Sequence, residues 1–142
     1  MARFDPRQVV VTLNGVTIDG YADGADVINA TQEADAGEWV TGADGYGVFV
    51  ANSDESGVLT LKLKQHCKSN NHLAKLMKQQ RRSLKGFKPF RLEIRDLLNE
   101  DLLTAVNGYF TKVPAFVRGQ GHNATIWTFK FEKMESTLEE GF

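Results

Sequence analysis

The sequence predicts a mainly β protein, an antiparallel β-sandwich or barrel with one flanking α-helix. Seven or eight short segments are rich in β-branched residues or alternate between apolar and polar residues, as half-buried strands do. Only one segment, near the middle of the chain, has apolar residues at helical spacing. Parallel strands need repeated crossover helices, so a chain with a single helix favours antiparallel pairing.

Length and composition indicate one domain that spans residues 1–142. Hydrophobic residues at 42% and charged residues at 25% are typical of a soluble globular protein. No apolar run approaches the roughly 18 residues of a membrane-spanning helix, so no membrane partner is expected. Cys67 is the single cysteine, which excludes an internal disulfide and favours synthesis in a reducing cytoplasm.

The first part of the chain predicts a hairpin followed by a short strand. Residues 8–13 are rich in β-branched side chains, and the Asn14-Gly15 pair favours a two-residue turn into residues 16–18. Residues 25–31 contain Val27 and Ile28 and predict another short strand after a turn-rich connector.

Residues 32–47 show no sustained period and predict a long loop. Long loops in compact domains are functional or disordered, and disorder normally excludes large aromatic residues. Two interpretations stay open: Trp39 folds back onto the core of its own chain, or the loop reaches another chain, where Trp and Tyr are common anchors. Residues 47–51 then predict a short buried strand. The candidate interface residues of the loop are Glu33, Asp35, Glu38, Trp39, Asp44 and Tyr46.

A strand, a helix and a second strand follow in the middle of the chain. Residues 57–65 and 90–96 alternate as half-buried strands do, with leucines at 59, 61 and 63 on one face of the first. Residues 69–84 place Leu73, Leu76, Met77 and Leu84 along one helical stripe. Ser69 or Asn70 is expected to cap the start of this helix, and a glycine and a proline end it.

Two strands and a tail complete the chain. The first begins at Leu102 and continues to Val113, with a bulge or a turn at Asn107-Gly108. Residues 124–134 form the longest late strand, with Trp127, Phe129 and Phe131 on one face. Residues 135–142 are polar and acidic, and they are expected to fray unless a partner orders them.

The charges are segregated along the chain. Residues 1–61 carry two basic and ten acidic side chains, residues 62–95 carry eleven and one, and residues 96–142 carry four and seven. These blocks are either solvated faces or two unlike surfaces that attract each other between copies. A nucleic-acid-binding β-domain is a further alternative, against which the scarcity of neighbouring aromatics and the net charge of −1 both count. The candidate basic interface consists of Lys75, Lys78, Arg81, Arg82 and Lys85.

No motif points to catalysis, a cofactor or a metal. His66, Cys67 and His72 are possible metal ligands, but their spacing meets neither common zinc pattern and a structural role is favoured. The sequence contains no nucleophile elbow, phosphate-binding loop or paired catalytic carboxylates. We therefore expect a protein that is not an enzyme.

The order of these elements resembles the tail tube proteins of contractile-tailed bacteriophages, which are similar to the tube protein of type VI secretion. The resemblance covers residues 7–134 or so, and no single motif carries it. It rests on the valine-rich hairpin, the long acidic loop with its tryptophan, the Leu61-Lys62-Leu63-Lys64 strand end, the Leu73-Ala74-Lys75-Leu76 helix, the Phe90–Asp96 strand, Val113-Pro114, and Trp127-x-Phe129-x-Phe131.

The resemblance implies a structural subunit of the virion tail. Six copies would form a ring, rings would stack into a hollow tube for DNA, and inner strands of neighbours would join around the lumen. Residues 32–47 would reach adjacent subunits and rings, with Trp39 and Tyr46 as anchors, and the helix at 69–84 would pack beside the barrel. The partners would be further copies, the sheath, baseplate and tape-measure proteins, and DNA in transit. Assembly would take place in the cytoplasm of the bacterial host, and a type VI secretion-like tube is the related alternative.

One expectation about the lumen follows from charge. A dense basic lining would hold the phosphates of passing DNA. The basic helix is therefore expected to face neighbours or the exterior, and the lumen is expected to be polar or acidic.

Overall fold

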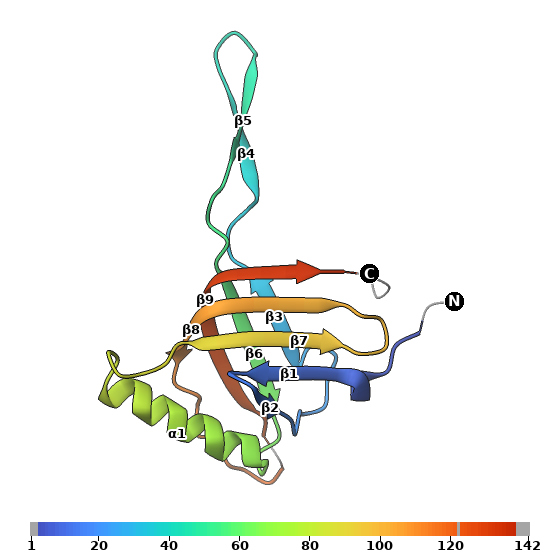
Figure 1. Cartoon of the computed structure of the whole chain (residues 1–142), viewed down its shortest axis with the longest axis vertical. Helices are drawn as coiled ribbons and strands as arrows, with labels where there is room; N and C mark the ends of the chain where they lie inside the picture. Colours follow the sequence, from blue (N-terminus) through green and yellow to red (C-terminus); the bar gives the residue numbers. More distant parts are fainter. Residues whose placement is uncertain (1–2, 122, 139–142) are drawn as a thin grey trace.

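The computed structural model describes residues 3–121 and 123–138 of the chain. Seven strands form one antiparallel sheet in the order β2-β1-β7-β8-β9-β6-β3, and two further strands form the separate hairpin β4-β5 (Figure 1). One α-helix, α1, lies at the end of the molecule opposite to this hairpin (Figure 1). The prediction of a mainly β, antiparallel fold with one flanking helix is confirmed for the described residues.

The elements follow the predicted order with several changes in their bounds. A short 3-10 turn, Pro6–Gln8, precedes the first strand. The elements are β1 (Val9–Leu13), β2 (Val16–Ile18), β3 (Ile28–Gln32), β4 (Gly37–Thr41), β5 (Gly47–Ala51), β6 (Gly57–Leu63), α1 (Lys68–Arg82), β7 (Phe90–Asp96), β8 (Leu102–Lys112) and β9 (Thr125–Thr137).

The large sheet folds over on itself so that its apolar face encloses the core. In Figure 1, β1, β7, β8 and the end of β9 run across the picture, whereas β6, β3 and the start of β9 run behind them. The register of β8 against β9 shifts between Phe110 and Lys112, and Asn107 has a positive φ of 57°. Gly108 is needed here, because a Cβ on it would lie 2.2 Å from a ring carbon of Phe131. The strand therefore continues through Asn107-Gly108 with an irregularity instead of turning back.

The core consists of the inward faces of these strands, as the alternation predicted. The predicted inward residues of β6 and β9 are all at most 3% exposed. Aromatic rings meet at its centre, where Phe110 lies 4.7 Å from Phe129 and 5.1 Å from Phe90 between ring centroids. The helix closes the open end with its buried residues Leu73 and Met77.

The start of α1 differs from the prediction. Cys67 occupies the cap position and makes no side-chain capping bond, whereas Ser69 and Asn70 lie inside the helix. Ser69 Oγ accepts a hydrogen bond of 3.2 Å from the Asp19 backbone, and Asn70 Oδ1 accepts one of 2.9 Å from Trp127 Nε1. Both side chains therefore join the helix to other elements, because burial beside partners outweighs local capping.

The ends of two segments, α1 and β9, also differ from the prediction. The helix ends at Arg82, and Leu84 lies beyond it and is 64% exposed, so Leu84 is not part of the buried stripe. Residues 135–137, predicted to fray, are paired in β9, with Glu135 opposite Thr104 and Thr137 opposite Leu102. The length of β8 supplies these partners. Of the rest of the predicted tail, Leu138 is exposed after the end of β9, and residues 139–142 lie outside the described residues.

Candidate assembly surfaces

The hairpin β4–β5 projects from the folded sheet along the long axis of the molecule (Figure 1). Its strands pair from Gly37 opposite Ala51 to Thr41 opposite Gly47. Residues 32–47, predicted as a loop, thus include a complete strand and a turn. The predicted strand at 47–51 exists, but it is exposed at every position instead of buried.

One face of the hairpin is aromatic. Trp39 and Phe49 are directly opposite each other, with ring centroids 5.4 Å apart in an edge-on arrangement. Each ring lies diagonally over a glycine: a Cβ on Gly37 would come within 2.4 Å of Phe49, and one on Gly47 within 3.3 Å of Trp39. The glycines leave room for the rings to lie against the backbone, which gives the aromatic face one defined shape.

The opposite face of the hairpin is aliphatic. The alternation of the strands places Val40, Val48 and Val50 there, with Glu38 at the edge. These valines are about half exposed or more. An isolated two-stranded hairpin is marginally stable in water, and apolar residues on both of its faces are typical of an interaction site.

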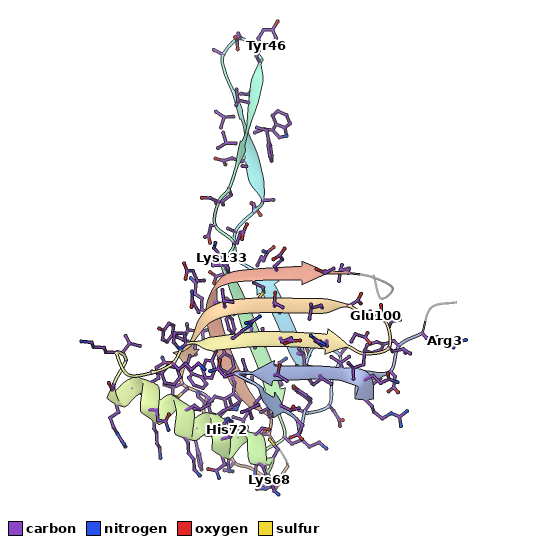
Figure 2. The ribbon with its side chains drawn as sticks, in the orientation of Figure 1. Arg3, Tyr46, Lys68, His72, Glu100 and Lys133 are labelled. Atoms are coloured by element: carbon purple, nitrogen blue, oxygen red, sulfur yellow. The ribbon has the colours of Figure 1, made fainter. Side chains whose placement is uncertain are left out.

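The hairpin keeps its aromatic residues away from the core of its own chain. Trp39 is 71% exposed and Tyr46 is 79% exposed, and Figure 2 shows Tyr46 at the tip. The interpretation that Trp39 folds back onto its own core is therefore wrong, and its ring contact is with Phe49. The tip is a defined turn in which Gly42 N–H donates to the Tyr46 carbonyl at 2.9 Å and Tyr46 N–H donates to Asp44 Oδ1 at 3.2 Å.

The four acidic candidates of this segment lie at different heights along it. Glu33 lies at the base, where its carboxylate pairs with Lys130 at 2.9 Å and raises the pKa of that lysine by accepting its hydrogen bond. Asp35 and Glu38 are exposed on the stem, and Asp44 is at the tip. The structure brings Asp44 close to Tyr46, but it separates both from Glu33.

The base of the hairpin is fixed to the sheet by backbone and side-chain hydrogen bonds. Glu33 N–H donates to the Ser56 carbonyl at 3.2 Å, and Asn52 N–H donates to the Ala36 carbonyl at 2.8 Å. The Asp54 carboxylate accepts a bond of 2.9 Å from Ser56 N–H, which lowers the pKa of Asp54. The stem is therefore anchored at its base.

The five basic candidates are all exposed, four of them on α1 and Lys85 just after it. Within residues 3–121 and 123–138 none of the five forms an ion pair with a carboxylate. Two hydrogen bonds fix α1 to β8. The Gln80 side-chain amide donates to the Phe110 carbonyl at 3.0 Å and accepts from the Phe110 N–H at 2.9 Å. This surface presents uncompensated positive charge on a fixed support. The five residues are Lys75, Lys78, Arg81, Arg82 and Lys85.

The outer strands of the large sheet form a further candidate surface. β2 pairs only with β1, and β3 pairs only with β6, within the described part of the chain. Their outward backbone groups can therefore pair with a strand of another molecule.

Sequence reasoning missed several exposed apolar residues. The valines of β5 were expected to be buried, and the segment after β8 received no function although Val113 is 64% and Phe116 is 83% exposed. The guanidinium of Arg118 lies 4.2 Å from the centroid of the Phe116 ring. The sequence carried no signal for the exposure of the valines, because three consecutive apolar residues such as Val48, Phe49 and Val50 are typical of a buried strand.

The described residues offer little ligand chemistry. Over residues 3–121 and 123–138, no three His, Cys, Asp or Glu side chains lie together in a way that could hold a metal ion. Over the same ranges, the structure has no helix with the length and apolar character needed to cross a membrane.

Comparisons with known proteins agree with the architecture. Two chains from structures of an extracellular contractile injection system are similar in fold to this chain. One comes from the PVC sheath–tube complex in its extended state, and the other comes from the PVC sheath/tube terminator, also in its extended state. The first has a TM-score of 0.65 and 12% identity, covering 96% of this chain and 92% of that one. The second has a TM-score of 0.62 and 10% identity, covering 97% and 99%.

A chain of the anti-feeding prophage cap, which terminates a tube, has a TM-score of 0.63 and 14% identity over 97% of this chain and 93% of that one. Identities this low show a shared fold. A search of curated proteins found no match. The family model described as bacteriophage PhiTE tail tube protein matches residues 9–139, nearly the whole chain. The chain therefore belongs to the bacteriophage PhiTE tail tube protein family, and it is a structural subunit of the tail tube, a part of the virion.

Proposed function

We propose that six copies of the chain form a ring, that rings stack into a hollow tube, and that DNA passes through its lumen during ejection. The observation that carries the proposal is the hairpin β4–β5, which is apolar on both faces and exposed in the single chain. Such a surface is stable in water when neighbours cover it. The candidate residues of the hairpin and of the basic helix are then contacts between copies.

The edges of the sheet support closure into a ring. β2 and β3 lie at opposite ends of the strand order, so β3 of one copy can pair with β2 of the next. A contact between two unlike surfaces repeats around an axis and closes if its rotation permits. Sheet continuity would then form the wall of the tube, without any enzymatic activity, and the whole described chain would act as one tube-forming domain.

The outer surface of the tube would contact the sheath. The PVC chain with a similar fold comes from a sheath–tube complex, which supports a sheath around the tube formed by this chain. Baseplate and tape-measure proteins would meet the tube at its end and inside its lumen, and assembly would occur in the cytoplasm of the host. The exposed cations of α1 would face neighbours or the sheath, which leaves a polar or acidic lumen for DNA.

Negative-stain electron microscopy of the purified chain tests the proposal directly. We expect rings or tubes with a central channel at high protein concentration. A single particle at every concentration would overturn the proposal. A DNA titration at two salt concentrations separates the alternative, because tight binding with a steep salt dependence would indicate a nucleic-acid-binding domain instead.

A further inference from the structure

A groove lies at the end of α1, between the helix and the segment that leads into β7. It has a volume of about 470 Å³. Its apolar lining comes from Leu76, Phe87 and Phe90, and the last two rings meet edge-on at 5.4 Å between centroids. The side chains of Arg82 and Lys88 add positive charge to the same lining. We refer to this site as the helix groove; its remaining lining residues are Asn14, Gln79, Ser83 and Gly86.

The hairpin tip has the complementary chemistry. Tyr46 presents a phenol ring that is 79% exposed, and the Asp44 carboxylate lies two residues before it. The turn holds the two together, because Tyr46 N–H donates to Asp44 Oδ1 at 3.2 Å. An aromatic ring beside a carboxylate fits a site with an apolar floor and a cationic rim. The ring is buried against the floor, and the carboxylate accepts charge-assisted hydrogen bonds from the cations of the rim.

The tip and the helix groove of one chain cannot meet. In Figure 1 the hairpin and α1 lie at opposite ends of the long axis, and in Figure 2 Tyr46 is at the far end from Lys68 and His72 of the helix. A contact between these two surfaces is therefore a contact between copies, and because the surfaces differ, it is a head-to-tail contact.

We propose that the hairpin tip of one copy docks in the helix groove of a second copy, with Tyr46 against Leu76 and Phe87 and Asp44 paired with Arg82 and Lys88. The inference rests on the proposed self-assembly and deepens it by naming both halves of one contact. The contact joins the acidic projecting end of each copy to the basic opposite end of the next. It therefore gives the segregated charge of the sequence a specific use.

Cysteine crosslinking tests this pairing in the full chain. With Cys67→Ser as background, Ala43→Cys places a thiol beside Asp44 without changing Asp44 or Tyr46, and Ser83→Cys places one in the helix groove. A short bismaleimide crosslinker should give a ladder of covalent oligomers from the double variant. Lys68→Cys replaces Ser83→Cys in the control, since Lys68 is exposed at the other end of the same helix, roughly 20 Å away at 1.5 Å per residue.

The outcomes separate this inference from the proposed function. A ladder from Ser83→Cys and none from Lys68→Cys supports the docking, and mixing the two single-cysteine proteins should then give only dimers. Equal ladders from both variants, or tubes in the microscope without a Ser83→Cys ladder, would overturn the docking and leave the tube intact. If the parent chain forms neither rings nor tubes, the proposed function and the docking both fail.

A charge exchange tests the same contact without crosslinking. Asp44→Arg and Arg82→Asp should each raise the critical concentration for assembly at least about tenfold, because each places like charges together. The double variant should recover most of this loss. Lys75→Asp is the matched control, since Lys75 is exposed on the same helix but does not line the groove. Rescue of Asp44→Arg by Lys75→Asp to the same extent would show that only overall charge matters and would overturn the assigned pairing.

Discussion

Replacing each tryptophan with alanine separates folding from assembly in this chain. The sequence has two tryptophans, Trp39 on the hairpin and Trp127 in the core, with exposures of 71% and 3%. We expect Trp39→Ala to change the free energy of unfolding of the single chain by no more than about 0.5 kcal/mol, as surface substitutions usually do. The reason is that its ring contact is with Phe49, on a hairpin outside the core.

The effect of Trp39→Ala on assembly should be much larger. With a side chain that covers up to about 250 Å², the exposed 71% of Trp39 leaves about 180 Å² for a neighbouring copy to cover. At about 25 cal/mol per Å², this burial contributes at most about 4.5 kcal/mol, or roughly two-thousandfold in the critical concentration for assembly.

The control is Trp127→Ala, which should lower the free energy of unfolding by about 3–5 kcal/mol by leaving a cavity in the core. It also removes the indole N–H that donates to Asn70 at 2.9 Å. Urea denaturation followed by circular dichroism measures the unfolding, and sedimentation of the tubes measures the critical concentration. If Trp39→Ala loses as much stability as Trp127→Ala, Trp39 belongs to the fold of its own chain. If Trp39→Ala assembles at the wild-type concentration, Trp39 makes no important contact between copies.

Three further substitutions test the core and the basic surface. Gly108→Ala should lower the free energy of unfolding by about 1–3 kcal/mol, because its Cβ would lie 2.2 Å from a ring carbon of Phe131. Gly121→Ala is the control, since a Cβ there meets nothing within 4 Å. Equal urea midpoints for the two variants would contradict tight packing at Gly108. Asn70→Ala should lower the free energy of unfolding by about 1–3 kcal/mol, because it leaves the indole N–H of Trp127 unpaired. The control is Asn71→Ala at the exposed neighbouring position, and an equal loss of stability in both variants would contradict this role of Asn70. A triple alanine variant of the basic surface should weaken assembly, and unchanged tube formation would exclude a role for this charge. Its three positions are Arg81, Arg82 and Lys85.

The elements that depend on the core of the chain itself were predictable from sequence. The alternation of β6 and of β9 marks an inward face, because water lies on one side of those strands and the core on the other. Leu59 and Phe129, for example, are fully buried as their positions predicted. The hairpin β1–β2 was predicted from a different local signal, the Asn14-Gly15 pair, which favours a two-residue turn.

The hairpin β4–β5 was not predictable by that logic. Val48, Phe49 and Val50 are apolar on both faces, so their pattern resembles a strand buried in the chain, whereas all three are exposed. An apolar pattern in the sequence indicates that the side chains are buried, but it does not indicate whether their own chain or another molecule buries them. The prediction of the cap of α1 was wrong for a related reason, because the side chains of Ser69 and Asn70 form hydrogen bonds with segments that are distant in the sequence. The interface residues themselves stay predictions.

The hairpin is inserted between two strands that are already neighbours. Gln32, the last residue of β3, lies opposite Gly57, the first residue of β6. The whole projection from residue 33 to residue 56 therefore leaves and re-enters the sheet at a single point. A short turn could replace this excursion without disturbing the strand pairing below it. The length and sequence of the hairpin can therefore change while the sheet that carries it stays constant.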